Sequence, residues 1–424
     1  MKNSKALWWV VVINTLYNLM QGISALAIPW FFIKTKDMSS QWGLIYLSIT
    51  ILTLFWGIYA GTIVDKYNRK KVLFYNPLLC GIILTFLSFV YSISDNDIFI
   101  SALCFGVIFF SYSLYFPNLY AICQEMTHSK DYGRVNSILE IQGQFSLIIA
   151  GSIAALMMNG ATSGNWPIFG FDVFVGFKFN AWPLDQIIFW NGVGLIITSF
   201  FANGIKYELL NIRKPDGGSI GKRIKEGFVF MFSHKMLFLF GMTSFMVFCV
   251  VLVINFMLSP QYIAQHLMGG DEVYGTSEIY FGMGSALAGV LIYQIFKKYH
   301  ALYGICVLIG LTTLVLFFSV VNSSIFYFYV SFFFLGFCNA GIRVLRITYL
   351  LDIIPTRLIG RSNSVFNVMN SMIRMILIGL FSIPFFNIDN NVIYAFLIMG
   401  VILSLALVIT ITYRKAIIKL VVSK

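Results

Sequence analysis

Three arginines, Arg343, Arg346 and Arg374, stand inside long apolar stretches of this sequence. At the centre of a bilayer an Arg costs roughly 2.5–3.5 kcal/mol on insertion scales, so each needs a partner or a function. A guanidinium keeps its positive charge and binds carboxylates through paired hydrogen bonds. The carboxylates Glu140 and Glu278 are predicted within about one turn of helix ends, where solvent or a partner explains them. These residues predict recognition of an anionic or zwitterionic solute, with no evident proton carrier.

Polar side chains recur at helical spacing in four apolar stretches. The members of each set are three or four residues apart, which places them on one helix face. The sets are Asn14, Asn18 and Gln21; Asn255, Ser259 and Tyr262; Asn339, Arg343 and Arg346; and Asn363, Asn367, Asn370 and Arg374. Such faces either line a polar pathway or bond to one another between packed helices, and both readings stay open. The expected solute-binding residues are Arg374, Arg343, Asn14, Asn18, Gln21, Asn255, Asn339, Asn367 and Asn370.

The composition excludes most classes of soluble protein. Of the 424 residues, 59% are hydrophobic and 11% are charged. Soluble domains carry nearer a quarter of charged residues, so this chain cannot cover a water-exposed surface of its size. The six cysteines lie in or beside apolar runs without closely spaced pairs, so we expect no disulfide, metal or cofactor. The chain is therefore predicted to be a polytopic membrane protein.

Twelve apolar stretches are long enough to cross a bilayer as helices, at about 20 residues each. They run over residues 7–33, 42–64, 72–93, 98–122, 135–158, 186–205, 236–262, 276–296, 301–320, 326–350, 362–386 and 391–412. With the N-terminus inside, most of the 29 Lys and Arg residues fall in cytoplasmic segments, as the positive-inside rule requires. The sequence predicts an all-α multi-pass protein of the cell (inner) membrane with both termini cytoplasmic.

A long segment that is predicted to be cytoplasmic, residues 206–235, separates the first six spans from the last six. The expected domains are a first six-helix bundle, residues 1–205, the linker 206–235, and a second six-helix bundle, residues 236–424. Within the linker, apolar residues from Ile220 to Met231 recur at helical spacing opposite basic ones. This pattern predicts an amphipathic helix on the inner leaflet.

The other long segment between spans, residues 159–185, is predicted to be external. Its apolar residues alternate strictly from Phe169 to Phe179, with Trp166 and Trp182 at the flanks. A period of two indicates an extended strand or hairpin near the outer surface.

A short internal repeat supports the division into two bundles. Residues 133–137 (GRVNS) match residues 360–364 (GRSNS) at four of five positions, and the same offset pairs Glu125 with Asp352. Both copies open a predicted helix. Many secondary transporters are built from such repeats.

The most specific motif is the segment between the second and third spans, residues 61–71 (GTIVDKYNRKK). It resembles the GxxxD(R/K)xxR(R/K) signature of the major facilitator superfamily, at the place where that family has it. The resemblance implies that the Gly allows close helix approach, while the Asp and the basic residues form a charge cluster with helix ends of the other half. By this resemblance Gly61, Asp65, Arg69 and Lys70 form a conformational latch. The residues expected to act with them in gating are Arg134, Glu140, Arg346 and Arg361.

Within that family the chain is most similar to the branch of macrolide efflux proteins and enterobactin-type siderophore exporters. The similarity rests on the DKYNRKK loop, on residues 225–227 (KEG), and on the two GR-x-NS segments. In two places the chain departs from the family pattern. The second-half counterpart of the signature, residues 288–300, has no Asp, and the fifth span lacks the Gly-Pro motif of drug antiporters. The first departure implies that only one latch is intact, and the second counts against drug/proton antiport.

The favoured function is a secondary active transporter, a monomer that exports a small or medium amphiphilic organic anion such as a siderophore by alternating access. A multidrug or macrolide efflux pump with proton antiport is the alternative, because abundant aromatic residues could line a promiscuous cavity. A membrane-embedded enzyme is a remote alternative, since no nucleophile, His or metal cluster is predicted at membrane depth. The expected partners are the solute and the lipid bilayer, with no nucleic acid.

Overall fold

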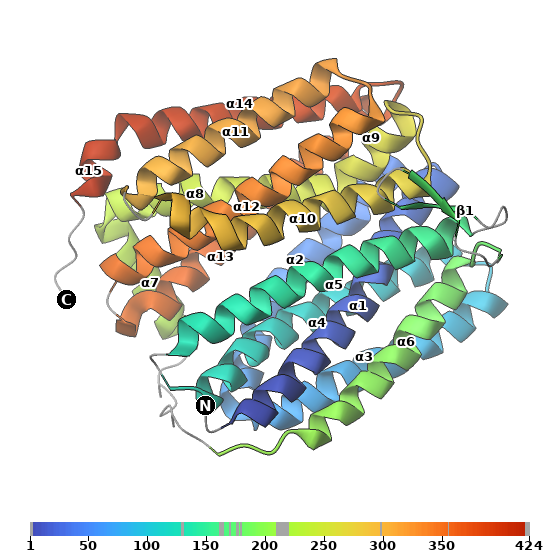
Figure 1. The fold of residues 1–424 in the computed structure, drawn as a ribbon, viewed down its shortest axis with the longest axis horizontal. Coiled ribbons are helices and arrows are strands. Elements are labelled where there is room, and N and C mark those ends of the chain that lie inside the picture. The colour runs from blue at the N-terminus through green and yellow to red at the C-terminus, as the bar shows by residue number, and fades with distance from the viewer. Residues whose placement is uncertain are drawn as a thin grey trace. The chain divides into compact units, whose positions relative to one another are not determined.

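The computed structural model describes residues 3–128, 131–160, 165–168, 171–174, 178, 180–208, 220–296, 299–354 and 356–419 (Figure 1). In these residues, 12 helices are long and apolar enough to cross a membrane. The predicted all-α polytopic architecture is confirmed.

Two of the first six spans end in a short π-helical or 3₁₀ extension. The six spans are α1 (Ser4–Trp30) with the π-helical η1 (Phe31–Thr35), α2 (Ser39–Lys66), α3 (Arg69–Ile93), α4 (Asp97–Met126), α5 (Tyr132–Asn159), and α6 (Leu184–Phe201) with the 3₁₀ turn η3 (Ala202–Gly204). Between α5 and α6, strands β1 (Asn165–Ile168) and β2 (Phe171–Phe174) pair antiparallel.

The remaining elements begin with α7 (Ile220–Ser233). The seventh span is built from three consecutive pieces, α8 (Lys235–Val253), the π-helical η4 (Ile254–Leu258) and α9 (Ser259–Gln265). The later elements are α10 (Asp271–Phe296), α11 (Ala301–Val321), α12 (Ile325–Ile353), α13 (Thr356–Phe381), the 3₁₀ turn η5 (Pro384–Asn387), α14 (Val392–Thr412) and α15 (Arg414–Ile418).

The chain forms two compact units. Unit 1 comprises Met1–Met38, Ser48–Asp216 and Gly270–Ile279, and unit 2 comprises Ser39–Leu47, Gly217–Gly269 and Tyr280–Lys424. The division differs from a cut at the linker because the first turns of α2 pack with unit 2, and those of α10 pack with unit 1. Each unit is described by itself below.

Small residues set the closest helix contacts inside each unit. In unit 1, α3 packs along α6, where a Cβ on Gly81 would lie 2.6 Å from the Gly192 carbonyl oxygen. In unit 2, a Cβ on Gly336 of α12 would lie 2.0 Å from the Phe281 carbonyl oxygen of α10. Glycine at these positions lets the helix backbones touch, which is how helices gain packing energy in a bilayer.

Two local elements lie in the segments where the sequence patterns predicted them, and the start of α10 differs from the prediction. The expected hairpin is present as β1 and β2, although Phe169 and residues 175–177 and 179 lie outside the described residues. The expected linker helix is present as α7. However, α10 begins at Asp271 and not at 276, so Glu278 lies two turns inside the span. The predicted start of this span is too late in the sequence, which placed Glu278 near a helix end.

Candidate functional site

The signature segment of unit 1 is held by its own turn. After α2 ends at Lys66, the Asn68 side chain caps α3 by accepting hydrogen bonds from the backbone N–H groups of Lys70 (3.0 Å) and Lys71 (3.3 Å). Asn is a favoured N-cap because its carbonyl satisfies N–H groups that have no partner in the first turn. The cap makes Arg69 the first residue of α3 and fixes where its side chain starts.

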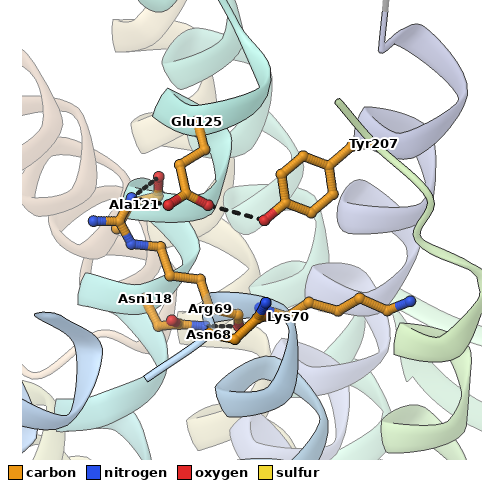
Figure 2. A network of polar contacts seen from close by, with 7 residues as sticks. All are labelled: Asn68, Arg69, Lys70, Asn118, Ala121, Glu125 and Tyr207. Atoms are coloured by element: carbon orange, nitrogen blue, oxygen red, sulfur yellow. Dashed lines mark hydrogen bonds and ion pairs between the residues drawn. The ribbon is translucent and has the colours of Figure 1, made fainter. Parts of the chain in front are cut away.

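Arg69 reaches the end of α4, as Figure 2 shows. Its Nη1 lies 2.9 Å from Oε1 of Glu125 in an ion pair, and it also donates to the carbonyl oxygen of Ala121 at 3.1 Å. In return, Asn118 Nδ2 donates to the Arg69 carbonyl oxygen at 2.9 Å. The two charged side chains are 13% and 20% exposed, so solvent screens this pair less than a surface pair.

Tyr207, at the start of the linker, completes the cluster. Its hydroxyl donates to Oε2 of Glu125 at 2.9 Å, so both carboxylate oxygens are engaged. Burial, followed by the hydrogen bond to Glu125 and the charge of that carboxylate, raises the pKa of Tyr207 well above its ordinary value, while Arg69 opposes the rise. The phenol therefore stays protonated at neutral pH and keeps donating.

Asn3 ties the first residues of the chain to the same region. Its Nδ2 donates to the carbonyl oxygens of Met126 (3.0 Å) and Glu208 (2.9 Å), and its Oδ1 accepts from the Glu208 N–H at 3.2 Å. One buried amide thus joins the N-terminus, the end of α4 and the start of the linker. We call Asn3, Arg69, Asn118, Glu125 and Tyr207 the inner cluster of unit 1.

The structure describes the side chains of only some of the other residues expected in the latch and in gating. Lys70 Nζ donates to the carbonyl oxygen of Asn203 at 3.3 Å. A Cβ on Gly61 would meet no atom of the structure within 4 Å, so Gly61 makes no close helix approach among the described residues. The side chains of Asp65, Arg134, Glu140 and Arg361 lie outside the described residues, as does that of Asn363.

Sequence reasoning missed four members of the inner cluster. Asn3, Asn118 and Tyr207 carry no motif. Glu125 was noticed only as the repeat partner of Asp352. A signal was available, because Glu125 is a carboxylate at the end of a span, on the side of the membrane where the sequence also places the basic signature loop.

The polar face of α1 is buried in unit 1 and bonded within it. Asn14 donates to Gln142 of α5, and Asn18 donates to Asn14 at 3.2 Å. Gln21 donates to the Tyr17 hydroxyl at 3.3 Å and also contacts Cys80. Asn14 and Gln21 therefore bond to neighbouring helices, while Asn18 bonds within α1, and this favours packing over a freely accessible polar lining.

In unit 2, Arg346 of α12 and Asn370 of α13 both contact Phe245 of α8. Arg346 is only 4% exposed, its guanidinium lies 3.5 Å from the centroid of the Phe245 ring, and its Nη1 donates to the Ser244 carbonyl oxygen at 2.9 Å. Asn370 Nδ2 donates to the Phe245 carbonyl oxygen at 3.2 Å. Arg346 therefore folds inward over an aromatic ring, a cation–π contact, and does not extend toward the membrane surface.

Arg374 lies one turn beyond Asn370, close to the middle of the span Ser364–Phe381. Its Nε is buried without a hydrogen-bond partner among the described residues, and the same holds for Nε of Arg346. Arg343, Asn339 and Asn255 are half-buried, with Asn255 in η4.

Asn367, on the preceding turn of α13, is exposed. We call the residues Arg343, Arg346, Asn370 and Arg374 the arginine cluster of unit 2. Its side chains present hydrogen-bond donors, which a carboxylate or catecholate ligand requires.

Comparison with known proteins identifies the family. The sequence profile of the Major Facilitator Superfamily matches residues 10–378. The chain belongs to this superfamily. As a major facilitator protein it is a membrane transporter of small-molecule solutes and not an enzyme. No curated protein sequence matches this chain significantly.

Solved major facilitator structures share the fold at low identity. A bacterial homolog of the human lysosomal transporter Spinster, solved in an inward-facing and unoccupied conformation, has a TM-score of 0.70 at 14% identity, covering 100% of this chain and 99% of its own. The nucleoside transporter NupG has a TM-score of 0.66 at 14% identity, covering 98% and 99%. A D-xylose-proton symporter has a TM-score of 0.67 at 12% identity, covering 94% and 97%. These likenesses concern the fold alone.

Proposed function

We propose that this transporter exports a small or medium amphiphilic organic anion, such as a carboxylate or catecholate siderophore, by alternating access. One observation carries the proposal. The parts of the spans that belong to unit 2 contain Arg343, Arg346 and Arg374 and not a single Asp or Glu. No carboxylate of those spans can neutralise Arg346 or Arg374, each of which has a buried Nε without a hydrogen-bond partner among the described residues, and such charge inside a membrane is costly. A bound organic anion would supply the missing negative charge.

The arrangement of the donors supports an amphiphilic solute over a simple inorganic anion. Arg346 presents its guanidinium against the ring of Phe245, which itself stacks on Phe366 with 5.3 Å between ring centroids. Buried donors next to aromatic faces suit a ligand with both a charged group and a flat apolar body. Of the arginine cluster, Arg374 is the residue we place first in anion binding.

Outward transport rests on the resemblance to the exporter branch and on the membrane potential. An anion leaving a cell that is negative inside gains about 2.3 kcal/mol per charge per 100 mV. The proposal includes an inner-membrane location, cytoplasmic termini and a monomeric transporter.

Binding to the purified transporter tests the proposal directly. The probes are a catecholate siderophore and a macrolide, titrated against wild type, Arg374→Lys and Arg374→Gln. Loss of one charged hydrogen-bond donor pair should weaken siderophore binding about tenfold or more in Arg374→Gln, equal to ~1.4 kcal/mol, with partial recovery in Arg374→Lys. Arg414→Gln, outside the spans and exposed, is the control and should bind as wild type.

The efflux-pump alternative predicts a different pattern. Macrolide export that survives Arg374→Ala but is abolished by Glu140→Gln would overturn the anion proposal. Metabolite profiling of the medium from a deletion strain would then identify which solute no longer leaves the cell.

A further inference from the structure

Glu278 is a buried carboxylate that the proposed function does not use. It follows Asp271, the first residue of α10, by seven residues, or about 10 Å along the helix axis. It is 5% exposed, and its Oε1 has no hydrogen-bond partner in the described part of the chain. Native proteins rarely leave a buried polar atom unbonded, so this one requires an explanation.

Glu278 ends a segment of α10 that packs inside unit 1. At the start of this segment, Trp30 of α1 donates from Nε1 to Asp271 at 2.7 Å and stacks on Tyr274 with 5.3 Å between ring centroids. These contacts anchor the first turn of α10 to the end of α1. We call residues 270–279 the docked segment.

The next turn of the docked segment lies against α5 at van der Waals contact. A Cβ on Gly275 would stand 2.2 Å from the Ala155 Cβ and 2.8 Å from the Gly151 carbonyl oxygen. A Cβ on Gly151 would in turn lie 3.1 Å from the Cβ of Glu278. The small residues of α5 therefore press directly on the backbone and on the base of the Glu278 side chain, leaving no room for a hydration shell there.

The described groups of unit 1 around Glu278 provide no positive charge. On α12, which also packs against α10, the charged residues are Arg343 and Arg346; they follow Gly341, where a Cβ would meet Ile292, fourteen residues beyond Glu278. Asp271, Glu272 and Tyr274 are the other titratable groups of the docked segment, and two of them are acids. The span of α5, from Ile141 to Asn159, contains no titratable residue, and α1 contains none between Gln21 and Trp30. Lys34, in η1, acts on Asp271 at the far end of the segment. An ionised Glu278 would therefore be a buried charge without a counter-ion among the described residues of unit 1, which is strongly unfavourable.

We propose that Glu278 is a proton-binding site that controls the docked segment. With its proton, the neutral carboxylic acid can be buried against α5 at little cost. When the segment leaves α1 and α5, the carboxylic acid meets water, gives its proton to water and becomes a carboxylate. Docking therefore takes up one proton and release gives one back. This inference goes beyond the proposed function and does not depend on which solute is carried.

Hydrogen–deuterium exchange of the purified protein tests the link between protonation of Glu278 and release of the docked segment. The experiment needs no substrate. The peptides to follow cover residues 270–279 and 151–155, between about pH 5 and about pH 9. Wild type, Glu278→Gln and Glu272→Gln are compared at the same pH, so that the intrinsic pH dependence of exchange cancels. A single released proton makes the opening constant rise by up to about tenfold per pH unit. We expect this rise in wild type and in Glu272→Gln, and none in Glu278→Gln.

Infrared spectroscopy provides the second readout. A protonated carboxylic acid has a C=O stretching band distinct from that of a carboxylate. The neutral-pH spectrum of wild type should contain such a band, and Glu278→Gln should lack it. The inference is overturned if wild type and Glu278→Gln open with the same pH dependence, or if no band distinguishes them. Should Glu278→Gln fail to fold, Glu278→Asp keeps a titratable group and must retain a pH-dependent opening.

Discussion

Arg69 at the first position of α3 and Glu125 in the last turn of α4 form an ion pair 2.9 Å long within one six-helix unit. The Arg of the signature motif therefore bonds to a carboxylate of its own unit. Because Tyr207 occupies the second oxygen of Glu125, the start of the linker is bound to the same carboxylate. Any rearrangement of the linker changes the environment of this pair.

Removing either partner of the pair should destabilise unit 1. Arg69→Ala leaves Glu125 partly buried with only the Tyr207 hydroxyl, and Glu125→Gln leaves Arg69 with a neutral acceptor. We expect both variants to lower the thermal midpoint in detergent, and the double variant to show a coupling energy of about 1 kcal/mol. Lys70→Ala is the control, since Lys70 is more exposed and bonds only to a backbone carbonyl. Additive effects would show that the pair has no energetic role.

Tyr207→Phe should lose one charge-assisted hydrogen bond and little else. A hydrogen bond to a charged group contributes about 1.5–3 kcal/mol, so the variant should melt measurably below wild type. The matched control is Tyr67→Phe, because Tyr67 is 56% exposed in the neighbouring turn. An unchanged midpoint for Tyr207→Phe would mean that Glu125 finds another donor.

His300 should make the stability of unit 2 depend on pH. It is the N-cap of α11, where Nδ1 accepts from the Leu302 N–H at 3.2 Å, and burial lowers its pKa below the ordinary value of 6.5. Since the unfolded chain binds the proton more readily, the stabilisation is complete above about pH 6.5 and is lost as pH falls below that value. The thermal midpoint of wild type should therefore fall relative to that of His300→Asn on acidification, because Asn caps at any pH. Parallel curves would contradict this.

The close approach of α10 and α12 should not tolerate a methyl group. Gly336→Ala would place a Cβ 2.0 Å from the Phe281 carbonyl oxygen, which forces the helices apart. We expect a loss of about 1–3 kcal/mol, as for overpacked cores. Gly289→Ala in α10 is the matched control, because a Cβ there meets no atom of the structure within 4 Å. It should be neutral or slightly stabilising, since Ala favours helix over Gly by up to ~1 kcal/mol.

Most of the fold could be predicted because membrane spans follow from length and hydropathy. The spans, the linker helix α7 and the external hairpin all carry periodic or compositional signals. The start of α10 was misplaced because residues 271–275 include two acids and a glycine, which lower the hydropathy of a segment that is nonetheless helical. Tertiary packing against α1 and α5 decides that boundary, and no local pattern reports it.

The candidate site was less predictable, for a different reason. Helical periodicity indicates which residues share a face, but not which side chain lies opposite. It therefore found Asn14 and Arg346 without finding Gln142 or Phe245, their partners on other helices. Asn3 and Tyr207 lie outside any span, where no periodicity applies. Their role depends wholly on contacts between segments far apart in the sequence.

The Asn3–Glu208 bonds hold together the two ends of residues 3–208, the stretch of chain that contains α1 to α6. Its six helices form a closed circuit, with the entry and exit of the chain held together by one side chain. A module whose ends meet can be copied, cut out or joined to another without threading through its own interior. This property makes the linker the natural place to divide this protein into two co-expressed polypeptides.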